Sequence, residues 1–211
     1  MPVFPRLLLC LVMVASCFPA KRAIAQQADE PRPVNRTAAV GGLLGGIAVA
    51  FAAHESGHLL FDVIFDADPG VKRVEYQGIP FFAITHRSGL PRHQEYTISA
   101  AGFWVQQGTN EWLLTSRPRL RYEHAPFSKG LFAFNVGASA MYSVAAFART
   151  GPPERDTRGM AVSSRSDEPW IGALVLAPAV FDTWRYLDPD SRVAVWLSRA
   201  AKVGTVLLVL R

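Results

Sequence analysis

Cysteine is nearly absent from this chain, which has 2 cysteines among 211 residues, Cys10 and Cys17. Both lie near the N-terminus, where a basic residue precedes the apolar run from Leu7 to Phe18. Ala23-Ile24-Ala25 follows and has small residues at the two positions that a signal peptidase reads. This is the pattern of a secretory signal peptide, which we expect to be residues 1–25. Cleavage there removes both cysteines, so a disulfide framework and thiol chemistry are excluded from the mature chain.

Two alternatives to this cleavage stay open. The apolar run is short for a membrane span, but it can stay attached as an uncleaved signal anchor. Val14-Ala15-Ser16-Cys17 also resembles the motif at which a lipoprotein is cut before its cysteine.

Residues 26–37 are polar and contain prolines, which indicates a linker. Residues 38–211 are expected to form a single membrane-embedded domain.

Charged residues are also few, at 18% of the chain, whereas 50% is hydrophobic. That composition is too apolar for an ordinary soluble domain and indicates a small integral membrane protein, which we expect in a bacterial inner membrane. The net charge of +5 comes from arginines and lysines between apolar segments, as in loops that lie near anionic lipid headgroups. These residues gather on no single face and no aromatic residues are interleaved with them, which argues against a nucleic-acid partner.

The apolar segments alternate with polar loops, and each predicts a helix. They are residues 38–65, 98–115, 131–148, 170–186 and 193–210, with a basic, polar loop expected at 149–169. Residues 131–148 carry no charge and are the clearest membrane candidate. Residues 71–84 have β-forming side chains around Gln77-Gly78-Ile79-Pro80 and predict a short hairpin. The expected fold is therefore an all-α polytopic membrane protein, a bundle of about 4–5 transmembrane helices with a small β-hairpin after the first.

Small and polar residues predict how these helices pack. Gly41 with Gly45, and Gly42 with Gly46, form small-xxx-small pairs that let a neighbouring helix approach closely. Polar residues in the segment 98–115 share helical faces, so its polar side is expected to face the bundle interior. The pairs that share a face are Gln106 with Asn110 and Gln107 with Glu111.

A His-Glu-x-x-His motif occupies residues 54–58, inside the first apolar segment. Residues four apart on a helix share one face, so His54 and His58 can offer two imidazoles to one zinc ion, with Glu55 beside them as a base. In a chain of this length and composition, the probability that such a motif occurs by chance is on the order of half a percent. Histidines in an apolar segment are costly unless paired or metal-bound, which favours a zinc site over a helix whose polar residues merely bond to neighbours.

The motif and its setting resemble the site-2 protease family of intramembrane zinc metalloproteases. The resemblance covers residues 38–186 and rests on the motif at 54–58, the hairpin-like stretch after it and an acidic residue in a late apolar segment. Ala101-Gly102-Phe103-Trp104-Val105-Gln106 also has the outline of the family's Ala-Gly-Pro-x-x-Asn stretch, with Phe103 and Gln106 replacing proline and asparagine. The resemblance implies a zinc-dependent peptidase that cleaves membrane proteins or membrane-associated peptides.

The resemblance also implies a third zinc ligand, normally an aspartate that is commonly followed by glycine. This chain has no Asp-Gly dipeptide, so we take Asp182, the only acidic residue in its apolar segment, because a carboxylate there needs a cation. The alternative is that Asp182 is a helix-end aspartate beside Arg185.

Other residues are expected around the site. The resemblance implies that Gln106 or Asn110 binds the substrate backbone or the oxyanion. Asp62 follows His58 by one helical turn and can hydrogen-bond a ligand imidazole, or it is simply an interfacial residue at the end of the span. The remaining histidines fall in polar or basic loops and are expected to be solvated; they are His86, His93 and His124.

A different class of function is the alternative to the peptidase: a catalytically inactive membrane protein that uses the same residues for structural metal binding or transport. Glu55 separates the two, because a purely structural zinc site has no use for an ionised base beside a ligand. A soluble zinc peptidase with buried helices is a third reading, which the uncharged segment 131–148 argues against.

Overall fold

The structure is a computed structural model that describes residues 35–76 and 78–207. The expected signal peptide at 1–25 and most of the linker at 26–37 lie outside the described residues. The chain divides into Met1–Arg36 and Thr37–Arg211, and the description below concerns the second unit. Its helices and strands are α2 (Arg36–Ile64), β1 (Gly70–Tyr76), β2 (Ile79–Thr85), α3 (Arg92–Ser116), α4 (Pro126–Ala148), α5 (Asp156–Ser164), α6 (Glu168–Leu187) and α7 (Arg192–Leu207). A short 3-10 turn at Leu120–Tyr122 lies between α3 and α4.

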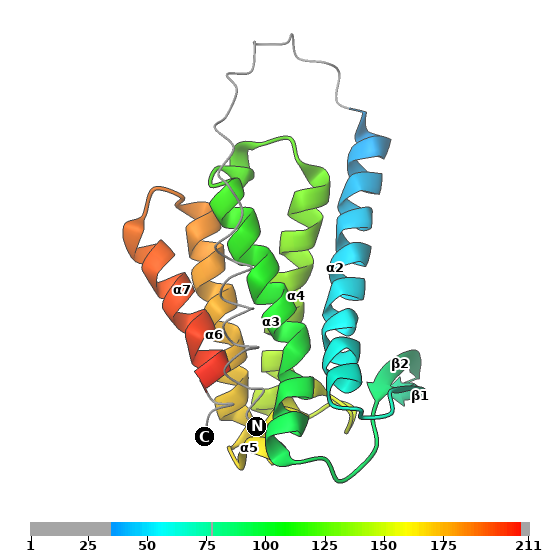
Figure 1. Ribbon diagram of the computed structural model, residues 1–211. Helices are drawn as coiled ribbons and strands as arrows, with labels where there is room; N and C mark the ends of the chain where they lie inside the picture. The colour runs from blue at the N-terminus through cyan, green and yellow to red at the C-terminus, as the bar shows by residue number, and fades with distance from the viewer. Residues whose placement is uncertain (1–34, 77, 208–211) are drawn as a thin grey trace. The chain divides into compact units, whose positions relative to one another are not determined.

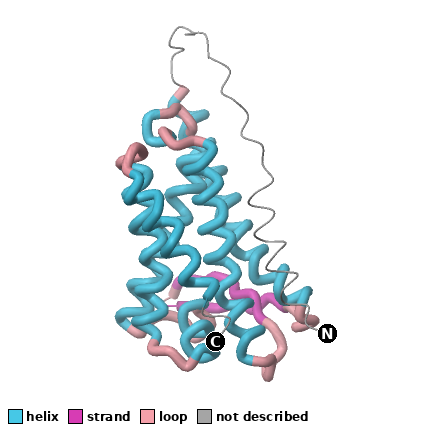
Figure 2. Tube along the Cα trace, turned by 60° about the vertical axis from the view of Figure 1, so that its left-hand side comes forward, coloured by secondary structure: helices cyan, strands magenta, loops and turns pink. Residues whose placement is uncertain are grey.

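The described chain is mostly helical with one small antiparallel sheet, as expected. In Figure 1 the long helices α2, α3, α4, α6 and α7 run beside one another, and the hairpin and α5 lie near the same end of the bundle. In Figure 2 the strands lie toward the lower end of the helices. Two of the described helices, α2 and α4, are long and apolar enough to cross a membrane by length and composition.

Glycines let α2 pack directly on the start of α4. A Cβ atom added at Gly46 would collide with the backbone carbonyl of Phe127, and one added at Gly42 would meet Pro126 at 3.2 Å. The expected close approach is therefore made by the pair Gly42 and Gly46. A Cβ at Gly41, of the other pair, would meet nothing within 4 Å.

The expected polar side of α3 does face the bundle interior. Gln106, Gln107 and Asn110 are all buried. Asn110 donates from Nδ2 to Asp182 of α6 at 3.1 Å and accepts at Oδ1 from Nδ2 of Asn135 of α4 at 2.9 Å. Side-chain amides can satisfy donors and acceptors at once, so this network joins three helices through hydrogen bonds as well as apolar packing.

The hairpin forms where expected, with Val71 opposite Ile84 and Val74 opposite Phe81. Gly78 in its turn has a φ of +81°, a conformation that glycine adopts without strain. The backbone N–H of Arg87, just after β2, donates to the carbonyl of Ala67 at 2.8 Å, which ties the hairpin to the segment that follows α2.

The segment at 149–169 differs from the loop expected there, because it contains the helix α5. Met160 on this helix is fully buried and belongs to the apolar core that includes Phe103 and Ile171. Arg155 donates two hydrogen bonds of 2.6 Å to the carboxylate of Glu168, which closes the segment onto the start of α6. A helix of nine residues is too short to show clear periodicity, so its polar composition dominated the sequence pattern.

Candidate metal centre

His54 and His58 lie on one face of α2 and point to a common position, as the motif predicted. Their Nε2 atoms are 3.2 Å apart, and the side chains are nearly inaccessible to solvent. Two buried imidazole nitrogens at this separation leave room for a third group that faces both of them. The helix alone supplies this half of the site.

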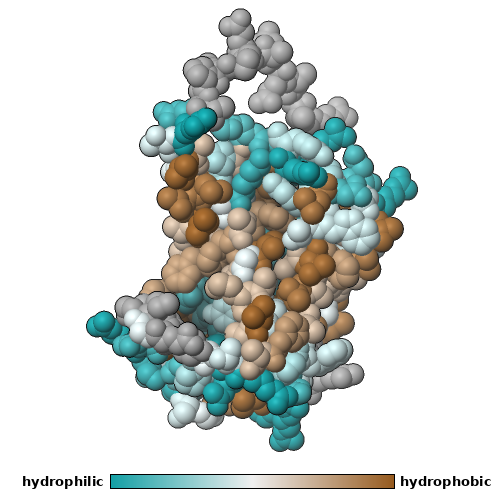
Figure 3. Space-filling model, turned by 180° about the vertical axis from the view of Figure 1, so that it is seen from behind, coloured by the Kyte–Doolittle hydropathy of each residue, from teal (hydrophilic) through white to brown (hydrophobic). Residues whose placement is uncertain are grey.

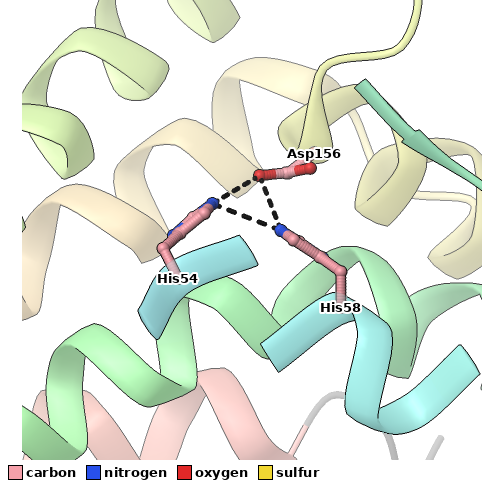
Figure 4. Close-up of side chains that lie close together, drawn as sticks. All are labelled: His54, His58 and Asp156. Carbon is pink, nitrogen blue, oxygen red and sulfur yellow. Dashed lines mark hydrogen bonds and ion pairs between the residues drawn. The ribbon is translucent and has the colours of Figure 1, made fainter. Parts of the chain in front are cut away.

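Asp156, the first residue of α5, supplies the third group. Its Oδ2 atom lies 3.2 Å from His54 Nε2 and 3.5 Å from His58 Nε2 (Figure 4). The ligand atoms of His54, His58 and Asp156 all lie within 4.8 Å of one another, so this group can hold a metal ion. Ligands about 2.0–2.2 Å from a tetrahedral metal are roughly 3.3–3.6 Å from each other, and the observed separations are close to that.

The histidines are held in this orientation by α3. His58 Nδ1 lies 2.7 Å from the carbonyl oxygen of Ile98, which makes Nδ1 the donor and leaves Nε2 free to bind a metal. A Cβ atom added at Gly102 would overlap the His54 ring. The glycine in the Ala-Gly stretch that carried the family resemblance therefore makes room for a candidate ligand.

The two imidazoles also fix the charge of the carboxylate. Burial alone would raise the pKa of Asp156, but the neighbouring His58 and His54 outweigh burial and hold its pKa well below the ordinary range. Asp156 is therefore ionised at neutral pH, which is the form that binds a cation.

The structure places Asp182, expected as the third ligand, in a different part of the bundle. Its Oδ1 atom lies 2.8 Å from Lys202 Nζ and accepts a hydrogen bond of 2.6 Å from Ser198. The carboxylate does pair with a cation, as its burial requires, but that cation is a lysine of α7. Asp156 takes the position beside the histidines that Asp182 was expected to fill.

The residues expected to bind substrate do not line the cleft beside the histidines, and their hydrogen bonds are made elsewhere in the bundle. Gln106 accepts at Oε1 from Ser139 at 3.4 Å, and Asn110 belongs to the network around Asp182. Asp62 does not contact a ligand imidazole, because the second nitrogen of His58 faces Ile98.

A cleft of about 350 Å³ opens beside the candidate ligands. Residues of α2, β2, α3 and α4, the segment before α5 and the first residue of α5 line the cleft. The polar ones include Glu55, His58, His86, Tyr142, Glu154 and Asp156. Glu55 is half-buried and lies in the same cleft as two of the candidate ligands. A substrate group in the cleft would therefore meet a base and a metal position together.

Sequence reasoning missed Asp156 and two cleft residues, His86 and Tyr142. Asp156 sat in a basic segment that was interpreted as a loop, although an acidic residue in the first turn is a recognised sign of a helix start. Tyr142 lies in the segment 131–148, whose lack of charge indicated a membrane span and gave no sign of a site residue. Its ring stacks with His54 at a centroid distance of 6.1 Å.

Comparisons with known proteins add no assignment: no protein-family model, no curated protein and no solved structure matches the chain. The chemistry of the site therefore rests on its geometry. Two imidazole nitrogens and a carboxylate oxygen form a ligand set that suits divalent metals such as zinc, with a glutamate in the adjoining cleft.

Proposed function

We propose that this protein is a zinc-dependent intramembrane peptidase that hydrolyses peptide bonds of membrane-associated proteins or peptides. The observation that carries the proposal is the convergence of His54, His58 and Asp156 on one position, with Glu55 in the adjoining cleft. Three protein ligands leave a position for water or substrate, whereas structural zinc sites usually have four protein ligands. The site-2 protease resemblance of the motif at 54–58 points the same way.

Glu55 has the role of general base and acid. When bound, zinc lowers the pKa of a coordinated water to about 7 and polarises a carbonyl group. Glu55 takes a proton from the attacking water and passes it to the amine that leaves when the peptide bond breaks. His54, His58 and Asp156 hold the metal, and the Ile98 carbonyl keeps the His58 ring in the binding tautomer.

The membrane location is supported by the surface as well as by composition. On the face shown in Figure 3, hydrophobic side chains gather along the middle of the helices and hydrophilic ones gather at both ends. The exposed apolar residues of α2 include Val40, Leu44, Leu60 and Val63. We propose a polytopic protein of the bacterial inner membrane, in which α2 and α4 cross the bilayer and present such side chains to lipid.

The test is the behaviour of Glu55→Gln in detergent-purified protein. We expect loss of hydrolysis of fluorogenic peptides, by at least about a hundredfold, with unchanged zinc content and unchanged thermal unfolding. Ser56→Ala, one residue along the same helix and exposed, is the matched control and is expected to keep full turnover. Zinc-loaded native protein that cleaves no peptide, or a Glu55→Gln variant as active as the native protein, would rule out the peptidase.

One observation favours a second function, a metal-binding membrane protein without peptidase activity. Asn110, one of the two amides expected to stabilise an oxyanion, donates to Asp182 in the network between α3, α4 and α6, and neither Gln106 nor Asn110 lines the cleft. A peptidase then needs another donor in the cleft. Under this second function Glu55→Gln leaves metal binding and every cellular phenotype of the protein unchanged, so the same variant separates the two.

A further inference from the structure

Three ionisable side chains from three separate elements meet at one side of the cleft. His86 follows β2 directly, Asp62 lies in the last turn of α2, and Glu95 lies in the first turn of α3. His86 Nε2 is 2.8 Å from Glu95 Oε2, and His86 Nδ1 is 3.5 Å from Asp62 Oδ1. The ring therefore has one carboxylate at each of its nitrogens.

Asp62 makes this arrangement more than a surface ion pair. Its exposed fraction is 0%, and neither carboxylate oxygen has a hydrogen-bond partner within residues 35–76 and 78–207. A buried carboxylate without a hydrogen-bond donor destabilises the folded protein, so a cation that pairs with Asp62 is expected to contribute to stability. His86 is the only side chain that pairs with Asp62 as a possible cation among the described residues.

The position of His86 connects this cluster to the site. Residues Phe82 to Ile84 of β2 line the cleft together with Glu55 and His58, and His86 itself is also in the lining. β2 pairs with β1 along one edge, and within the described sheet no strand pairs with its other edge. A restraint on His86 is therefore a restraint on the distance between this strand and the candidate metal ligands.

We propose that His86 is a positioning residue, an imidazole clamp between Asp62 and Glu95 that fastens the end of the hairpin to α2 and α3 and so sets the width of the cleft. Asp62 thereby acts on the strand rather than on a metal-ligating histidine. The clamp is a structural claim that holds whether or not the protein is a peptidase. Its kinetic consequence rests on the proposed function.

The first measurement is hydrogen–deuterium exchange of the hairpin in the detergent-purified full chain. His86→Phe keeps a ring of similar size and removes both nitrogens, and we expect the backbone amides of Ile79 and of residues 81–85 to exchange about tenfold faster. His124→Phe is the matched control, because His124 is an exposed histidine in the α3–α4 connection, and it should leave hairpin exchange unchanged. Unchanged exchange in His86→Phe overturns the clamp.

The second measurement asks whether Asp62 is the partner. His86→Phe leaves the buried Asp62 carboxylate uncompensated, so the double variant Asp62→Asn with His86→Phe is expected to unfold at a higher temperature than His86→Phe alone. His86→Gln keeps one donor and should recover part of the lost protection of the hairpin. If His86→Phe does not fold, recovery of folded protein in the double variant gives the same answer. Strictly additive effects of the two substitutions overturn the pairing.

The kinetic measurement distinguishes the clamp from the peptidase proposal. If both hold, His86→Phe raises KM for a fluorogenic peptide about tenfold and changes kcat less than about twofold, because the metal ligands and Glu55 are unchanged. Native protein that shows no hydrolysis, together with faster hairpin exchange in His86→Phe, removes the peptidase and keeps the clamp. Hydrolysis with unchanged exchange and unchanged KM in the variant keeps the peptidase and removes the clamp.

Discussion

Asp156 Oδ2 lies 3.2 Å from His54 Nε2, although the two residues are 102 positions apart in the chain. The contact joins the first turn of α5 to the middle of α2, and it brings an ionised carboxylate to two buried imidazoles. It is the relationship that turns a short helical motif into a site with three candidate metal ligands.

Removal of the Asp156 carboxylate is expected to weaken metal binding. In Asp156→Ala we expect the zinc retained after dialysis against a mild chelator to fall at least about tenfold, because two imidazoles alone bind zinc much less tightly than three ligands. Asp182→Ala is the comparison, since the structure pairs that residue with Lys202, and it should keep the native zinc content. Retained zinc in Asp156→Ala with lost zinc in Asp182→Ala would reverse the assignment.

A methyl group at Gly102 is expected to displace the His54 ring, because the added Cβ would overlap it. Gly102→Ala should lower zinc affinity and destabilise the protein by about 1–3 kcal/mol, the usual effect of overpacking a core. Gly108 lies on the same helix, and a Cβ there meets nothing within 4 Å. Gly108→Ala should therefore be neutral or stabilising by about 0.5–1 kcal/mol. Zinc titration and thermal unfolding of the two variants provide the comparison.

The contact between α2 and α4 gives a prediction about packing. Gly46→Val is expected to lower the unfolding temperature strongly, since even a Cβ would collide with the Phe127 carbonyl. Gly41→Val lies five residues before Gly46, where there is open space, and it should change stability by less than about 1 kcal/mol. Thermal unfolding in one detergent measures both. Equal loss in the two variants would mean that the helices do not meet at this face.

Lys202 is expected to stabilise the folded protein, because its ammonium group compensates the charge of the Asp182 carboxylate inside the bundle. Lys202→Met leaves the Asp182 carboxylate without its cation and should cost about 3–5 kcal/mol of stability. The double variant Lys202→Met with Asp182→Asn removes both charges and should recover most of that loss. Chemical denaturation gives the two free energies. A double variant as unstable as the single one would show that the ion pair is not the source of the stability.

Much of the helical framework could be predicted from local patterns. The apolar runs gave the positions of α2, α4, α6 and α7 to within a few residues at most ends, and alternating β-forming residues gave the hairpin. The polar face of α3 was also predictable, because the spacing of Gln106 and Asn110 fixes which side chains share a face. These features depend on interactions between residues close together in the chain.

The site was predictable only in the part that one helix builds. His54 and His58 are four residues apart, so the periodicity of a helix brings them together without help from the rest of the fold. The sequence favoured Asp182 because it lies in an apolar segment, whereas Asp156 lies in a polar segment that was interpreted as a loop, and both are far from the histidines in the chain. Burial correctly indicated that Asp182 needs a cation but could not say which one.

The sequence by itself determined the helices, the hairpin and the paired histidines, because backbone periodicity and hydrophobic pattern act over a few residues. Only the tertiary structure decided that Asp156 faces the histidines, that Lys202 compensates Asp182 and that His86 lies between Asp62 and Glu95. The physical reason is that a carboxylate binds whichever cation the packing of distant helices brings to it, and that packing is a property of the whole bundle.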